Sequence, residues 1–152
     1  LTLWASPTGR ALQTLAIIAE HLELDWHQAR TDARLVEIDM GSWGGRYYAD
    51  VVAEVGPVVD GEGLLRCAPD GESYPAIATR IGGWLADTDH DPGDRLVVMH
   101  GISSRVLRGV ATGAPVGACG APVLPGHPQG SVSLIEQGRE TLVHRGTGYA
   151  PA

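Results

Sequence analysis

The sequence contains no lysine and no phenylalanine, and it has only two cysteines among its 152 residues. All 11 basic residues are arginine. Without lysine, the chain cannot form a lysine Schiff base with a carbonyl substrate. It also cannot build a Walker-type phosphate loop, which places a lysine on the phosphates. Any binding of anions must therefore depend on arginine, histidine and backbone N–H groups.

Positive charge and long apolar runs are also scarce. The formal net charge is −7, and no cluster of basic residues occurs along the chain. Nucleic-acid binding is dominated by clustered positive charge, so we expect no nucleic-acid partner. No apolar run approaches the roughly 20 residues that span a bilayer, so we expect no membrane partner. With 43% hydrophobic residues, the chain is suited to one folded domain of ordinary size.

The two cysteines and the first residues give further expectations. Cys67 and Cys119 lie far apart in the sequence and cannot form a zinc site alone. We expect free thiols, because disulfide scaffolds are small and rich in cysteine. The chain begins with Leu1, without an initiator methionine or a charged leader. We therefore expect the natural N-terminus to lie upstream of Leu1.

Strand-like and helix-like segments alternate, which predicts an α/β sheet. Residues 1–5 resemble a short buried strand, and Ser6-Pro7 is typical of a helix start. The helix that follows is expected to run to about residue 21. The run at 95–99 is continuously apolar, as in a strand buried on both faces of a parallel sheet. The remaining predictions are an extended piece at 35–38, helices at 47–55, 73–85 and 103–111, loops at 58–70 and 116–129, and a hairpin from 131–135 to 141–145.

Candidate ligand-binding residues follow the two clearest strands. In open parallel sheets, ligands bind beyond the carboxyl ends of the strands. Arg10 lies in a first helical turn, where a cation is unfavourable unless an anion binds there. Otherwise Arg10 points into water or pairs with a carboxylate. His100 is either a core histidine or a ligand-binding one, and Gly101 after it permits close approach of a ligand.

Other candidates are less specific. Glu37 precedes a glycine- and tryptophan-rich loop, and it is either a solvated surface residue or a proton donor in the same crevice. Ser73 follows Gly71-Glu72, but Pro75 stands where a nucleophile elbow needs its second glycine, so a serine hydrolase is only weakly supported. The six histidines show no metal-binding spacing. We therefore expect no metal and no cofactor.

Four segments resemble, in order, the motifs of the histidine phosphatase superfamily, the phosphoglycerate mutase-like proteins. They are residues 6–14 (S-P-x-x-R-A-x-Q-T), residues 37–45 (E-x-x-x-G-x-W-E-G), Gly71-Glu72-Ser73 (G-E-S), and the strand with His-Gly at 97–101. Arg80 lies on the predicted helix that follows G-E-S. Together they cover essentially the whole chain. The resemblance implies one domain over residues 1–152, with a three-layer α/β/α fold and a mostly parallel central sheet.

The resemblance also implies roles for individual residues. In this family a histidine of an R-H-G motif, at the end of the first strand, attacks the phosphoryl group. No R-H-G occurs here, so we expect that strand, its loop and the first helix to lie upstream of Leu1. A true truncation would expose a long unpaired edge. Arg10 matches the arginine that clamps the phosphoryl group, His100 with Gly101 matches the second histidine, and Glu37 matches the general acid and base.

The sequence also offers candidates for the substrate pocket. Ser6, Trp43 and Tyr47 are candidates to line it. Gly44 replaces the glutamate of W-E-G, which affects the packing of that loop or its contact with substrate.

The branch of the family follows from the segment after this loop. Mutases carry a longer segment with a basic pair, whereas residues 46–70 are short and contain only Arg66 as a further arginine. We therefore favour a metal-independent phosphatase of small phosphomonoesters. A phosphoglycerate mutase and a non-catalytic phospho-ligand binding protein are the alternatives. We expect a cytoplasmic, bacterial protein, and a homodimer stays open.

Overall fold

Three short parallel strands form the central sheet, in the order β2-β1-β3. The computed structural model describes residues 1–148. Strand β1 (Thr2–Ala5) pairs with β2 (Arg30–Thr31) on one side and with β3 (Arg95–Val98) on the other. The remaining elements are α1 (Gly9–His21), α2 (Tyr48–Val55), α3 (Tyr74–Thr88), α4 (Gly101–Thr112), the hairpin β4 (Val132–Glu136) and β5 (Arg139–His144), and 3-10 turns at Trp26–Gln28, Ala33–Leu35 and Gly41–Trp43.

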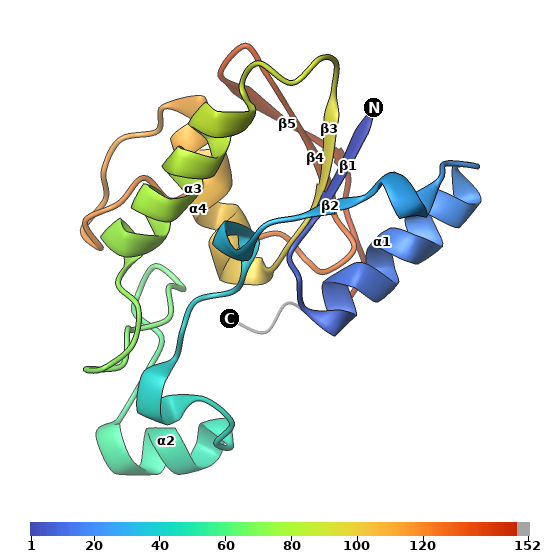
Figure 1. Cartoon of the computed structure of the whole chain (residues 1–152). Coiled ribbons are helices and arrows are strands. Elements are labelled where there is room, and N and C mark those ends of the chain that lie inside the picture. The colour runs from blue at the N-terminus through green and yellow to red at the C-terminus, as the bar shows by residue number, and fades with distance from the viewer. Residues whose placement is uncertain (149–152) are drawn as a thin grey trace.

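Helices cover both faces of the central sheet, which confirms the predicted three layers (Figure 1). On one face, α1 packs against β1, and Leu3 and Leu15 belong to one buried cluster. On the other face lie α3 and α4, with Trp4 and Trp84 in the larger core. These two rings meet edge to face at 5.6 Å between centroids. Successive side chains of a strand point to opposite faces, which is why Leu3 and Trp4 enter different layers.

One predicted element is wrong. Residues 35–38 do not form an extended piece: a 3-10 turn at Ala33–Leu35 gives way to a segment without regular structure. The cause is Asp32, whose carboxylate accepts the backbone N–H of Arg34 at 2.8 Å and starts the turn. The strand at this position is β2, immediately before Asp32.

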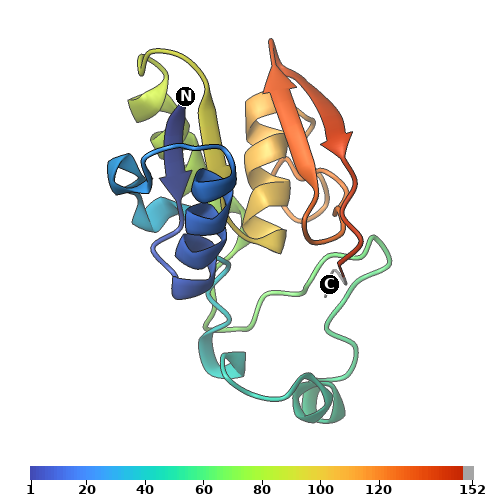
Figure 2. The same cartoon turned by 90° about the vertical axis from the view of Figure 1, so that its right-hand side faces the viewer.

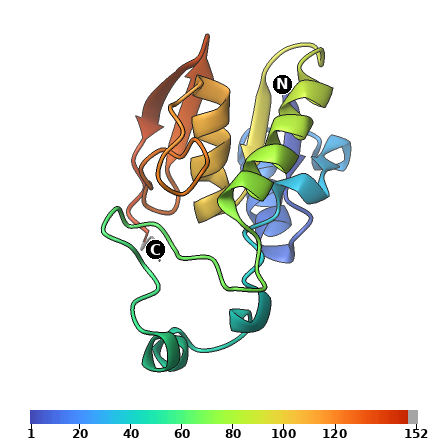
Figure 3. The same ribbon diagram turned by 90° about the vertical axis from the view of Figure 1, so that its left-hand side faces the viewer.

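Strand β3 is less buried than its apolar run predicted. Its four side chains are half-buried, although Val97 packs against one core and Leu96 and Val98 against the other. Among residues 1–148, β3 pairs with β1 and β4 pairs with β5, so β3 and β4 each have a second edge without a strand partner. Figures 2 and 3 show β3 and the hairpin as separate sheets, with α4 between them in both views.

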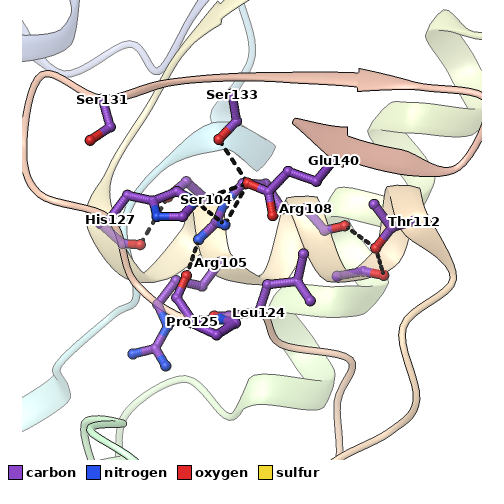
Figure 4. Close-up of polar contacts among 12 residues, drawn as sticks. Ser104, Arg105, Arg108, Thr112, Leu124, Pro125, His127, Ser131, Ser133 and Glu140 are labelled. Carbon is purple, nitrogen blue, oxygen red and sulfur yellow. Dashed lines mark hydrogen bonds and ion pairs between the residues drawn. The ribbon is translucent and has the colours of Figure 1, made fainter. Parts of the chain in front are cut away.

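Buried polar contacts tie α4 to the hairpin (Figure 4). Glu140 of β5 accepts hydrogen bonds through Oε1 from Arg108 Nη1 at 2.7 Å and from Ser133 Oγ at 2.7 Å, and the same oxygen lies 3.0 Å from His127 Nε2. Arg108 also donates to the Pro125 carbonyl at 2.6 Å. We call these residues the α4–hairpin clamp.

The segment between the sheet and α3 extends away from the layers. Figures 1 and 3 show α2 as the part of this segment farthest from the sheet, on the side where the strands β1 and β3 end. Within residues 1–148, no helix is both long and apolar enough to cross a membrane.

Candidate active site

The ends of β1 and β3 bring Ser6 and His100 together. Parallel pairing places Ala5 opposite Val98, and the Ser6 N–H donates to the Val98 carbonyl at 3.0 Å. Ser6 and His100 therefore leave the sheet side by side, at the carboxyl edge where ligands bind in open parallel sheets. The sequence motifs around these residues are 94 positions apart, yet the sheet joins them at one point.

The His100 ring is held at both nitrogens. Nε2 lies 2.8 Å from the hydroxyl of Ser6 and 3.2 Å from that of Thr8. Nδ1 accepts a hydrogen bond from Arg10 Nε at 3.2 Å. Because an arginine can only donate, the neutral ring assigned by this network carries its proton on Nε2. His100 thus presents an N–H donor toward Ser6 and Thr8.

The surroundings of His100 favour its neutral form. Burial lowers the pKa of His100, and the positive charges of Arg10 and Arg80 lower it further, whereas the negative charge of Glu37 acts in the opposite direction. The net pKa lies below the ordinary value of histidine. At neutral pH the ring is therefore a neutral hydrogen-bond donor rather than a cation.

Glu37 contacts the N-terminus of α4, the helix that begins directly after His100. Its carboxylate accepts the N–H groups of Ile102 at 3.1 Å and Ser103 at 2.9 Å, and it also accepts its neighbour Ile38 N–H at 3.0 Å. These amides belong to the N-terminus of α4, where free N–H groups and the helix dipole favour negative charge. A side chain at Gly101 would lie 3.8 Å from Glu37 Oε2.

Arg10 is the exposed residue of this group. Its Nε binds His100, and no residue of the described chain accepts a hydrogen bond from its two Nη groups. A guanidinium with free Nη groups can meet two oxygens of a phosphate at once. Arg10 and His100 therefore lie together beside the N-terminus of α4, where Glu37 accepts the amides of Ile102 and Ser103.

The loop that carries Glu37 is fastened by two glycines. Gly41 has φ +48, and a Cβ there would lie 2.6 Å from Asp70 Oδ1. A Cβ on Gly71 would lie 2.7 Å from the Asp39 carbonyl. Only glycine allows this approach. Asp70 accepts both the N–H and the hydroxyl of Ser42. Sequence reasoning missed this role of Asp70, for which the only local signal is the Asp70-Gly71 turn pair.

The three sequence-predicted pocket residues, Ser6, Trp43 and Tyr47, do not lie together. Ser6 is fully buried against His100. Trp43 borders a cavity of about 220 Å³, together with apolar residues of the α2 segment. Tyr47 is 82% exposed. No hydrogen bond or ion pair of the described residues joins Trp43 or Tyr47 to Arg10 or His100, so the structure does not bring these two groups together.

The described part of the chain contains no group of three metal-ligating side chains placed to hold an ion. Both cysteines are free thiols, as expected.

Comparison with known families decides the identity. The sequence model of the histidine phosphatase superfamily (branch 1) matches residues 2–146. This chain belongs to the histidine phosphatase superfamily. No curated protein sequence matches this family member.

Solved structures of other family members share its fold. A mycobacterial glucosyl-3-phosphoglycerate phosphatase aligns with TM-score 0.70 and 23% identity, covering 88% of this chain and 67% of that one. The α-ribazole phosphatase of Shigella flexneri aligns with TM-score 0.69 and 19% identity, covering 95% of this chain and 72% of that one. At these identities the likeness establishes the fold of this histidine phosphatase superfamily member.

Proposed function

We propose that this histidine phosphatase superfamily member hydrolyses small phosphomonoesters without a metal, through a phosphohistidine intermediate. The observation that carries the proposal is the convergence of Arg10, His100 and Glu37 at the N-terminus of α4. The names of similar structures support the phosphatase branch, since they include phosphatases of glucosyl-3-phosphoglycerate and α-ribazole phosphate.

In the proposed first half-reaction, a histidine nitrogen attacks phosphorus and the ester P–O bond breaks. Arg10 and His100 hold the non-bridging oxygens and offset their developing charge, with the phosphoryl oxygen taking the place of the Ser6 and Thr8 hydroxyls as acceptor of the His100 Nε2–H. Glu37 gives its proton to the leaving alcohol oxygen. In the second half-reaction, water attacks phosphorus, the N–P bond breaks, and Glu37 takes the proton from that water.

The nucleophilic histidine is not among the 152 residues, because no R-H-G motif occurs in them. We propose that it comes from a segment upstream of Leu1 in a longer natural chain. Supporting this, β3 has no partner strand on its second edge among the described residues. A further strand parallel to β3 would end beside His100, where the nucleophile is needed.

The segment before α3 supports a phosphatase over a mutase. Its two arginines are already engaged: Arg46 pairs with Glu54 at 2.6 Å, and Arg66 donates to the Pro57 carbonyl at 2.9 Å. Neither offers a free basic pair for the carboxylate of a phosphoglycerate.

The test uses the longer protein with its R-H-G motif, an aryl phosphate substrate and a metal chelator. Arg10→Ala and His100→Ala are each expected to lower kcat/KM by about 10²–10³, because each removes a donor to the transferring group. Arg46→Ala, which breaks an exposed ion pair, serves as control and stays near the parent rate. Near-parent activity in both site variants would refute the proposal. Binding of phosphate esters without turnover would identify a binding protein, and faster transfer within phosphoglycerate than to water would identify a mutase.

A further inference from the structure

Arg80 and Glu72 form a two-pronged ion pair directly behind the loop that carries Glu37. Arg80 Nε lies 2.6 Å from Glu72 Oε1, and Arg80 Nη2 lies 3.0 Å from Glu72 Oε2. Their side chains are only 16% and 17% exposed. A pair bound through two parallel hydrogen bonds has a fixed geometry, so it also fixes what else it contacts.

The other polar groups of this pair bind the backbone on both sides of Glu37. Arg80 Nη1 donates to the Arg34 carbonyl, and Nη2 donates to the carbonyl of Glu37 itself at 3.5 Å. Glu72 Oε2 accepts the Asp39 N–H at 3.4 Å, and the Glu72 N–H donates to the Asp39 carbonyl at 2.8 Å. Every one of these backbone partners lies within three residues of Glu37.

Glu37 depends on such support, because residues 36–40 belong to no helix or strand. Without a regular backbone ladder, the direction of a side chain is set by whatever side chains hold the main chain. We infer that Arg80 and Glu72 are positioning residues: they fix the main chain of Glu37 so that its carboxyl group meets the amides of Ile102 and Ser103. This inference rests on the proposed function, in which Glu37 is the general acid.

A purely structural ion pair would have a different consequence. It would stabilise α3 against the loop, and its loss would lower stability while leaving the Glu37 carboxyl in place. A positioning pair, when broken, releases the contact between Glu37 and α4 even in the folded protein. The two amides that bind Glu37 distinguish these cases, since they report the carboxyl group directly.

The experiment records the amide resonances of Ile102 and Ser103 in the 152-residue chain by NMR at one fixed, neutral pH. Glu37→Ala removes the acceptor of both amides and moves both resonances from their parent positions. Arg80→Met is expected to lose the parent positions as well, moving both resonances by about half or more of the Glu37→Ala displacement. Arg80→Lys does not restore them, because an ammonium group cannot bridge a carboxylate and two carbonyls.

Tyr74→Phe is the control on the same helix. It removes the hydrogen bond from Tyr74 to the Leu65 carbonyl, lowers stability and leaves the parent shifts unchanged. Parent-like shifts in folded Arg80→Met would overturn the inference. If that variant does not fold, Glu72→Gln keeps the arginine and is expected to show the same loss to a smaller extent, and parent-like shifts there would overturn it equally. The readout needs no turnover, so an inactive longer protein would refute the proposed function while this result stands or falls separately.

Discussion

At the scale of single residues, His100 shows how burial sets the state of a group at the site. Its ring is buried, Ser6 binds Nε2, and Arg10 occupies Nδ1. A proton added to Nδ1 would displace the Arg10 contact and place two positive charges together. Desolvation of the ring and the positive charge of Arg10 both disfavour the imidazolium form. The neutral ring keeps the Nε2–H group, so it can still donate a hydrogen bond to a phosphate oxygen.

The same effect predicts a pH dependence of stability. The pKa of His100 is lowered in the folded state from its ordinary value of 6.5, so the unfolded chain takes up that proton first as the pH falls. The stability that His100 contributes is complete above its unfolded pKa and is lost as the pH falls through its folded pKa. We expect the free energy of unfolding, measured with urea at a series of pH values, to fall across this window. In His100→Gln that part of the decrease is expected to be absent, and equal pH profiles for the two chains would contradict the prediction.

At the scale of elements, the α4–hairpin clamp adds a polar contact to the apolar packing of Ile135 beside α4. Burial alone would raise the pKa of Glu140, but hydrogen bonds from Ser133, Arg108 and His127 together hold that pKa below its ordinary value. Glu140 is therefore ionised and balances the charge of Arg108. The pair stabilises the position of the hairpin on α4 only while both charges are present.

Loss of Arg108 should be costly for that reason. Arg108→Met removes the arginine charge that balances Glu140 and the donor to the Pro125 carbonyl, in a site where the arginine side chain is only 6% exposed. We expect a loss of about 3 kcal/mol in the free energy of unfolding, measured by urea denaturation. Arg46→Met is the matched control, because its pair with Glu54 is exposed, and it should change stability by no more than about 0.5 kcal/mol. Equal losses in both variants would show that burial of the clamp does not matter.

Local patterns predicted most elements but not the contacts between them. The apolar face of α1 and the start of α3 follow from neighbouring residues, and both helices were predicted within a few positions. The turn that Asp32 starts was missed, because a side-chain cap competed with the apolar run after it. Contacts such as Asp70 with Ser42 join residues 28 positions apart and leave no periodic signal. The motifs of the resemblance indicated Arg10, Glu37 and His100 as site residues, but not what holds them.

At the scale of the whole molecule, the hairpin has two different faces. Ile135 packs against the large core beside α4. On the opposite face, Val132, Leu134 and Val143 are exposed, and Leu134 is 51% exposed. Val132 and Leu134 of this apolar face belong to β4, and the second edge of β4 has no partner strand in residues 1–148. Exposed apolar patches and open strand edges both favour association with another chain.

The 152-residue chain is therefore expected to self-associate through this face as its concentration rises, as seen by sedimentation equilibrium. Leu134→Asp should weaken that association by about tenfold or more, because it places a charge in the apolar patch beside the open edge. Ile17→Asp is the matched control: Ile17 on α1 is also about half exposed, at 50%, but lies on another element, so its variant should associate like the parent. Unfolding by urea should show little change in stability for either variant, since neither side chain belongs to a buried cluster. The prediction is wrong if the parent chain stays monomeric. It is also wrong if both variants weaken association equally, because the hairpin face is then not the surface through which the chain associates.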